Sequence, residues 1–504
     1  MADETGLNPY YFPLEGGLVL DQPTFNMSPG MALELLNYEP DIRGGYRRID
    51  GYLKWNPNVV PQTASSNEPV LMSAFFAGNN TVIAARGTSV YKAGTTGNWT
   101  AIDTGRSNAA KYTHFRYNLN GTENIIWADG ANHATKYDGT NVTDLNTTGA
   151  PANPKFVIGY KNAFFFAGHS ANVEELVFTA PYTDSDFSTA NGAGSIRVDS
   201  TITGLFPFRN ELFIFCEERI FRLVGNTIAD FQLQPVTRDV GCLNGFTIQE
   251  VAGEILFLGK DGIRTVAATE KINDVNLGTI TKPIQEIFSN FPDVSQFDSV
   301  VVPNKTQYRL FFTNTSKSSA AKTRGVIAVL KEKGFEFSEV EGIQPSSTDF
   351  LIVQGESFVL HGGFDGYVYR QEQGNTFDGA AIIGRYRSPD MTMGDAGLRK
   401  NFQRVIINYA PTGVLNSDLF IRYDYEAPTV ARPAAYPFDS SQIVALYGTS
   451  VYGTATYGGQ SNPLVRQPIE GSGFAIAMRV VDNATSAAYT LKGFQLEFTA
   501  GARR

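Results

Sequence analysis

The sequence predicts an all-β protein with an extended N-terminal arm, a β-propeller of seven blades or six, and a C-terminal β-sandwich. Three observations lead to this fold class. The composition combines 12% aromatic residues and 49 glycines with only 18% charged residues, which suits short strands and tight turns. A strand-and-turn unit recurs from residue 70, and near residue 379 it gives way to longer strands. We therefore assign residues 1–60 to the arm and a ring-closing strand, 61–378 to the propeller and 379–504 to the sandwich.

The arm covers residues 18–55 and has neither the alternation of a long strand nor the period of a long helix. Its prolines keep the backbone extended. The pair Gly44 and Gly45 permits a change of direction before a strand over residues 46–55. An extended arm needs another surface to lie on, so we expect residues 18–45 to reach a neighbouring chain.

The propeller repeat has a period of about 40 to 46 residues, which is typical of propellers and other arrays. Its first unit, residues 70–105, holds four alternating or apolar runs separated by turn residues such as Gly87. Residues 111–146 repeat this pattern, with Asp138-Gly139 at one corner. Two units in the same phase predict four-stranded antiparallel blades.

Seven residues occupy the same place in successive units. Because each marks one unit, they predict seven blades. The third unit is less regular, which leaves six blades open. The one long step contains residues 281–291, TKPIQEIFSNF, which predict a short helix between blades five and six. The last unit has only three strands, so the run 46–55 is expected to complete it and close the ring. The seven positions are Tyr91, Tyr137, Phe178, Phe221, Thr265, Val329 and Tyr369.

The last 126 or so residues read as a separate sandwich, because their strands are longer and alternate more strictly than those of the propeller. Within them, residues 445–459 form a stretch rich in Gly, Thr and Ser, in which Tyr447, Tyr452 and Tyr457 stand five apart. This spacing fits neither a strand nor a helix. We expect an exposed loop that makes contacts with other proteins.

The charge pattern argues against a protein that grips nucleic acid. The formal net charge is −9 and no cluster of Lys or Arg exceeds two in a row, so many phosphate contacts are not expected. Cys216 and Cys242 are too few for a disulfide framework and are expected to be buried thiols. The N-terminus does not resemble a secretion signal and no apolar run reaches membrane-spanning length, so we expect a soluble protein that begins near Met1.

The sequence offers few candidates for chemistry. His114, His133, His169 and His361 are scattered without metal-ligand spacing, and nucleotide-binding or nucleophile-elbow motifs are missing. We therefore expect no cofactor and no metal. The enzymatic alternative is a propeller glycosidase or lyase that uses paired carboxylates. Its candidate residues are Glu217, Glu218, Asp261 and Asp365, but three of these four stand at strand-entry turns, where hairpin geometry already explains them.

Several segments along the chain are those of one known family. They are the helical insert at 281–291, YRSPDMTMGDAGLRKNFQRVIINY, YGTSVYGTATYGG and the ending LKGFQLEFTAGARR. A further one is an N-terminal pattern made of Gly16-Gly17, Gln22-Pro23, Pro29-Gly30, Asn37, Gly44-Gly45, Arg47-Arg48 and Gly51. On these residues the chain resembles, over most of its length, the tail proteins of short-tailed phages, namely the nozzle (tail tubular protein B) and packaged-DNA stabilisation family.

The resemblance implies a structural virion protein with no enzymatic activity. Six copies would form a nozzle or hub ring below the portal and adaptor, flanked by adaptor and fibre or spike proteins. The ring would form the DNA channel, help to retain the packaged DNA and serve its ejection, without sequence-specific DNA binding. A glycan-binding, adhesive propeller is the first alternative and the glycosidase the second. The residues expected at contacts between subunits are Arg43, Tyr46, Arg47, Arg48, Tyr447, Tyr452 and Tyr457.

Overall fold

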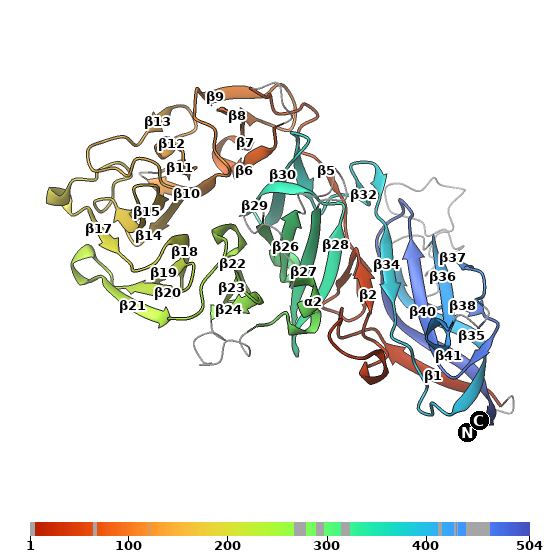
Figure 1. Cartoon of the computed structure of the whole chain (residues 1–504). Coiled ribbons are helices and arrows are strands. Elements are labelled where there is room, and N and C mark those ends of the chain that lie inside the picture. The colour runs from red at the N-terminus through yellow and green to blue at the C-terminus, as the bar shows by residue number, and fades with distance from the viewer. Residues whose placement is uncertain are drawn as a thin grey trace.

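A ring of β-sheets and a β-sandwich lie side by side in the computed structural model (Figure 1). The structure describes residues 6–63, 68–119, 121–266, 279–288, 297–313, 323–411, 416–427, 430, 432–439 and 464–503. The chain is nearly all β, as the sequence predicts. Among the described residues no helix is long and apolar enough to cross a membrane.

Seven sheets follow one another around the ring within the described residues. The first four have four strands each. They are β6 (Val70–Phe76), β7 (Thr81–Arg86), β8 (Ser89–Ala93) and β9 (Thr100–Thr104); β10 (Thr113–Leu119), β11 (Thr122–Ala128), β12 (Thr135–Tyr137) and β13 (Val142–Asp144); β14 (Phe156–Tyr160), β15 (Ala163–His169), β16 (Asn172–Phe178) and β17 (Gly194–Arg197); and β18 (Ile202–Phe208), β19 (Glu211–Cys216), β20 (Ile220–Val224) and β21 (Gln232–Thr237).

The remaining three sheets complete the ring. Blade five has three strands among the described residues, and blades six and seven belong to larger sheets. Their propeller strands are β22 (Gln249–Val251), β23 (Glu254–Gly259) and β24 (Gly262–Thr265); β25 (Asp298–Val302), β26 (Gln307–Thr313), β27 (Thr323–Lys331) and β28 (Gly334–Glu341); and β29 (Pro345–Val353), β30 (Glu356–Gly363) and β31 (Val368–Gln371).

The predicted phase of the repeat is confirmed, because all seven marked positions lie in the third strand of their blades. The third unit, which looked irregular in sequence, is a regular four-stranded blade. The second strands explain why the ring packs. In β7, Val82 and Ala84 join the core shared with blade seven, whereas Ile83 and Ala85 join the core shared with blade two. Alternation thus sends neighbouring side chains into two different cores, one on each face of the blade.

The ring is closed by the arm, as predicted, but by a shorter strand than the sequence suggested. The run 46–55 forms two strands, β4 (Tyr46–Arg48) and β5 (Tyr52–Lys54). Strand β5 pairs antiparallel with β31 and supplies the fourth strand of blade seven. Strand β4 instead pairs with β3 (Tyr38–Pro40) and with a strand of the sandwich. The two short strands β32 (Thr376–Phe377) and β33 (Ala380–Ala381) extend the sheet of blade seven beyond β5.

The sandwich consists of two sheets that both contain strands of the arm. One sheet has the order β3-β4-β41-β35-β38, in which β41 is Tyr489–Arg503, β35 is Leu398–Pro411 and β38 is Leu464–Pro468. Strands β1 (Asn8–Pro13) and β39 (Ser472–Gly473) add to it. The other sheet contains β2 (Glu34–Leu36), β34 (Gly384–Arg387), β40 (Ile476–Asp482), β36 (Asn416–Tyr423) and β37 (Tyr436–Asp439).

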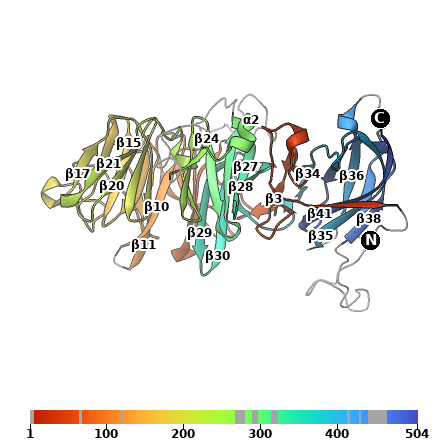
Figure 2. The same ribbon diagram turned by 90° about the horizontal axis from the view of Figure 1, so that it is seen from below.

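Strand β2 joins the propeller to the sandwich. It pairs in parallel with β28 of blade six and antiparallel with β34 of the sandwich, so the two bodies share one nine-stranded sheet. Figure 2 shows β3 of the arm between the two bodies. One hydrophobic core continues across this boundary and includes Leu35 of the arm, Leu310 of blade six and Phe494 of the sandwich, each 0% exposed. The propeller and the sandwich are therefore one packed unit.

The predicted helix between blades five and six is present as a short one. A 3-10 turn over Lys282–Ile284, with Pro283 in its first turn, continues into α2 (Gln285–Phe288). Ile284 and Phe288 are buried in the core that joins the two bodies. Other single 3-10 turns connect strands at Thr24–Asn26, Ala77–Asn79, Thr189–Asn191, Ile228–Asp230, Gly245–Thr247, Pro303–Lys305 and Asp424–Glu426.

Candidate functional site

Two of the residues predicted at subunit contacts are instead buried inside this chain. Tyr46 is 0% exposed: its hydroxyl donates to the carbonyl oxygen of Gly30 at 2.7 Å and accepts from the amide of Gly17 at 3.0 Å. Arg48 is 0% exposed and its Nη1 lies 2.8 Å from Oδ2 of Asp482, which is equally buried. The prediction for Tyr46 and Arg48 is wrong, because alternation in β4 turns both side chains into the sandwich core.

The same correction applies to most of the arm. Leu18, Ala32 and Tyr38 belong to the shared core, and the amide of Leu18 donates to Phe337 of blade six at 2.8 Å. Strand β1 pairs along its whole length with β41. Residues 18–45 therefore serve as an internal brace, and their removal is expected to unfold the chain rather than to leave a folded monomer.

The other predicted contact residues have different surroundings. Arg47 is partly buried and held within the chain by ion pairs to Glu39 at 2.9 Å and Asp50 at 2.7 Å. Arg43 lies in the exposed turn between β3 and β4, and it stays a predicted contact. Tyr447, Tyr452 and Tyr457 lie outside the described residues.

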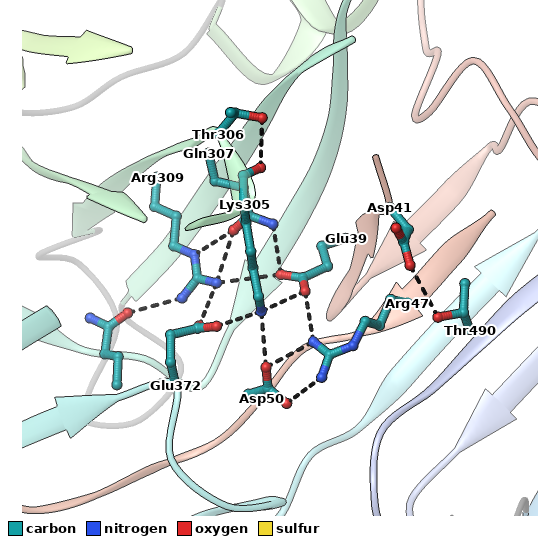
Figure 3. A network of polar contacts seen from close by, with 11 residues as sticks. Glu39, Asp41, Arg47, Asp50, Lys305, Thr306, Gln307, Arg309, Glu372 and Thr490 are labelled. Carbon is teal, nitrogen blue, oxygen red and sulfur yellow. Dashed lines mark hydrogen bonds and ion pairs between the residues drawn. The ribbon is translucent and has the colours of Figure 1, made fainter. Parts of the chain in front are cut away.

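A network of buried charges ties the arm to blades six and seven (Figure 3). Its centre is Glu39 of β3, which is 2% exposed and accepts from Lys305 Nζ at 2.7 Å and from Gln307 Nε2 at 2.8 Å. Lys305 also contacts Asp50 at 2.9 Å and pairs with Glu372, which follows β31. The arm, blade six and blade seven thus meet at the ammonium group of Lys305.

The charges of this network keep its carboxylates ionised. Burial alone would raise the pKa of Glu39, but the charges of Lys305 and Arg309, followed by that of Arg47, outweigh burial and lower the pKa. Burial would also raise the pKa of Asp50, and its hydrogen bond from Arg47 and the charge of Lys305 lower it far below the usual range. Both carboxylates are held ionised by their basic partners, so the network stabilises the contact between the arm and the blades rather than acting as an acid or base.

The propeller axis is crossed by ion pairs between blades that are not neighbours. Lys111, just before β10, places Nζ 2.8 Å from Oδ2 of Asp298 in β25. In β10 itself, His114 Nε2 lies 3.2 Å from Oδ1 of Asp349 in β29, and Arg116 pairs with the other carboxylate oxygen. Blade two is therefore bonded to blades six and seven across the middle of the ring. Such bonds obstruct the axis as a route for a macromolecule.

The four carboxylates proposed for a glycosidase mostly have local structural partners. Glu218 pairs with Lys260 on the surface at 3.2 Å. Asp365 accepts from the hydroxyl of Tyr369 at 2.5 Å, four residues along the chain. Burial would raise the pKa of Asp261, but Arg264 and Thr279 outweigh burial and lower it. Glu217 lines the cavity described below.

The histidines and cysteines do not form a reactive group. His361 is buried, and burial lowers its pKa to about 3, so its ring stays neutral. Burial raises the pKa of Cys216 to about 12 and that of Cys242 to about 11, which leaves both as inert thiols. Within the described part of the chain, no group of three or more His, Cys, Asp or Glu residues could hold a metal ion.

Sequence reasoning missed Glu39, Lys305 and Arg309 of the network, and Lys111 and Asp298 on the axis. Their partners lie far away in the chain, so no local spacing marks them. One signal was available for Arg48: it shares a face of its strand with Tyr46. If Tyr46 is buried, Arg48 must be buried as well, and it then needs an acidic partner.

Comparisons with known proteins found only distant structural similarities. No family model matches the chain, and the curated proteins contain no match. The AfRom2 CNH domain is similar with a TM-score of 0.37 and 9% identity, over 63% of this chain and 99% of that chain. An ancestral GH74 enzyme is similar with a TM-score of 0.39 and 10% identity, over 69% of this chain and 51% of that chain. BBS1N, in complex with ARL6DN, has a TM-score of 0.38 and 9% identity, over 65% of this chain and 99% of its own.

Proposed function

We propose that the protein is a structural subunit of a phage tail, six copies of which form a nozzle or hub ring below the portal and adaptor. The observation that carries the proposal is the nine-stranded sheet that runs from blade six through β2 into the sandwich. Backbone hydrogen bonds and one continuous core make the two bodies a stiff unit. Stiffness of this kind suits a ring that retains packaged DNA and keeps its shape during ejection.

The proposal puts the DNA path between the copies of the ring. The ion pairs of Lys111 and of Asp349 cross the propeller axis, which leaves no straight passage inside one subunit. The net charge of −9 suits a channel wall, since each neutralised phosphate would add salt-dependent affinity and slow the DNA. Adaptor or portal-side proteins and fibre or spike proteins are the proposed partners, and the virion tail is the proposed location.

The test is the oligomeric state of the full chain together with its presence in virions. Light scattering after size exclusion and negative-stain electron microscopy are expected to find rings of six, and mass spectrometry of purified virions is expected to find the protein. A chain that stays monomeric at high concentration and is missing from virions would sink the proposal. Hydrolysis of a polysaccharide that is lost in Asp261→Asn would favour the glycosidase instead.

A matched pair of variants sharpens the test. Arg43 is an exposed arginine in the turn of the arm, and Arg209 is an exposed arginine in a turn of blade four. Arg43→Glu is expected to weaken ring formation, because it reverses the charge of a proposed contact. Arg209→Glu is expected to leave ring formation unchanged.

A further inference from the structure

A cavity of about 750 Å³ lies among the blades of the propeller. Most of its wall comes from connections between consecutive blades and from turns between second and third strands, with a few residues of the strands themselves. Apolar side chains make up much of the wall, among them Leu71, Leu243, Phe246 and Phe364. This volume lies within the range of about 300 to 1,000 Å³ that is usual for small-molecule sites.

One lining residue of the cavity, Lys111, has an ammonium group that is only partly satisfied. Lys111 Nζ lies 2.8 Å from Asp298 and donates to the carbonyl oxygen of Phe297 at 3.2 Å. It also lies 4.4 Å from the centre of the Phe246 ring. An ammonium group has three N–H donors. Two of them have acceptors here, and Lys111 lines both this cavity and a smaller one that shares lining residues with it.

A second lysine, Lys155, lines the wall, and it is exposed. In the described part of the chain, the ammonium of Lys155 makes no hydrogen bond or ion pair, and it lies 5.4 Å from the centre of the Phe156 ring. Desolvation, and then the charge of Lys111, lower the pKa of Lys155. Both lysines line this cavity, so an anion that contacts both would be attracted by two positive charges.

Three acidic residues line the wall. Asp129, which follows β11 of blade two, is neutralised by Arg106 at 2.7 Å. Glu68 precedes β6 of blade one, and Glu217 lies in the turn between β19 and β20 of blade four. The lysines introduce blades two and three. Glu68 and Glu217 thus lie on other blades than the two lysines, and this separation would orient a charged ligand.

We propose that this cavity binds a small amphiphilic anion, an aromatic or alkyl group that carries a carboxylate, sulfonate or phosphate. The anionic group lies at Lys155 and the free donor of Lys111, and the apolar body packs against Leu243, Phe246 and Phe364. The site is independent of ring assembly, because its lining comes from the blade connections of one propeller.

The experiment uses the full chain and two probes, anilinonaphthalene sulfonate and the same ring system without the sulfonate. Fluorescence titration is expected to give saturable binding of the sulfonate. Lys155→Gln is expected to weaken it about tenfold, the loss for one charge-assisted contact of about 1.4 kcal/mol. Ala110→Glu, which adds an acid to the exposed wall, is expected to weaken it as well.

Lys161→Gln is the matched control. Lys161 also lies over an aromatic ring of blade three, 5.7 Å from the centre of the Tyr160 ring. It follows β14, whereas Lys155 precedes that strand. It is expected to bind the sulfonate like the wild type. Equal affinity of Lys155→Gln and wild type, or equal affinity for the charged and the neutral probe, would overturn the proposal, as would the lack of saturable binding.

Discussion

Strands β4 and β5 of the arm are separated by only Ile49, Asp50 and Gly51, yet they join different bodies by different chemistry. Strand β4 enters the sandwich and is fixed by the buried pair of Arg48 with Asp482. Strand β5 closes the propeller and is fixed by aromatic rings around Tyr52. The comparison teaches that this arm is not a tether, because each of its halves completes a separate sheet.

Gly51 lies where the arm passes from one body to the other. A side chain at this position would overlap the backbone oxygen of Thr376. The close approach of two backbones is therefore what requires glycine here. The same residue belongs to the N-terminal pattern on which the family resemblance depends, so a packing constraint accounts for that part of the pattern.

The largest effect is expected from breaking the ion pair that fixes β4 in the sandwich. Arg48→Ala leaves the carboxylate of Asp482 buried without its charged partner, and the free energy of unfolding is expected to fall by about 3–5 kcal/mol. Chemical denaturation measures this change. Arg43→Ala, on the exposed turn, is the control and is expected to stay within about 0.5 kcal/mol of the wild type.

The aromatic packing that fixes β5 in the propeller is tested at Tyr52. Its ring stacks on Phe377 with 5.0 Å between centres and meets Tyr369 at 4.9 Å and His361 at 5.1 Å. Tyr52→Ala is expected to lower the free energy of unfolding by about 2–3 kcal/mol, somewhat less than a fully buried aromatic. Hydrogen exchange is expected to rise in β31 and β5 but not in β41. Leu53→Ala, whose side chain is 46% exposed, serves as the control, and equal effects of the two substitutions would contradict the aromatic fastening.

The network of buried charges that ties the arm to blades six and seven is tested at Glu39. Glu39→Gln keeps the shape but removes the charge that faces Lys305 and Arg309, and a loss of about 2 kcal/mol in the free energy of unfolding is expected. Because the pKa values of Glu39 and Asp50 are lowered on folding, their contribution is present at neutral pH. It is lost as the pH falls below about 4. A wild type that keeps its full stability at pH 3 would argue against this network.

The smallest effect concerns the pH dependence of blade seven. Burial lowers the pKa of His361 to about 3, whereas an unfolded histidine titrates near 6.5, so the unfolded chain binds more protons between these values. The free energy of unfolding is therefore expected to fall by up to about 1.4 kcal/mol per pH unit below pH 6.5. Urea denaturation at pH 7.5 and 5.0 measures this slope. His361→Phe is expected to reduce the slope, and an unchanged slope would count against this assignment.

The propeller was predictable because its signals are local. Tyr91 and Thr265 occupy the same strand of their blades since each blade is a run of hairpins, and turn residues and alternation fix hairpins within a few residues. The predicted helix at 281–291 likewise rests on a short apolar spacing and a proline at its start.

The fastening of the arm could not be predicted in the same way. Arg48 meets a carboxylate 434 positions away, and Tyr38 meets Tyr489 across 451 positions. A sequence has no local mark for such pairs. The prolines and glycines of the arm correctly excluded long strands and helices, but they are equally compatible with an arm that reaches another chain. Lys155 and Lys111 were missed for a similar reason, because only the closed ring brings their separate blade connections to one cavity.

The position of β1 and β4 beside β41 also governs when the chain can fold during synthesis. Strands β1 and β4 are among the first made, but their partner spans Tyr489–Arg503 and is the last of the described strands to leave the ribosome. The blades can form hairpins as they emerge, whereas β1 and β4 stay without this partner until β41 has been made. Contacts of such large sequence separation slow folding. A chain that stops before β41 would therefore display β1 and β4 without their partner strand.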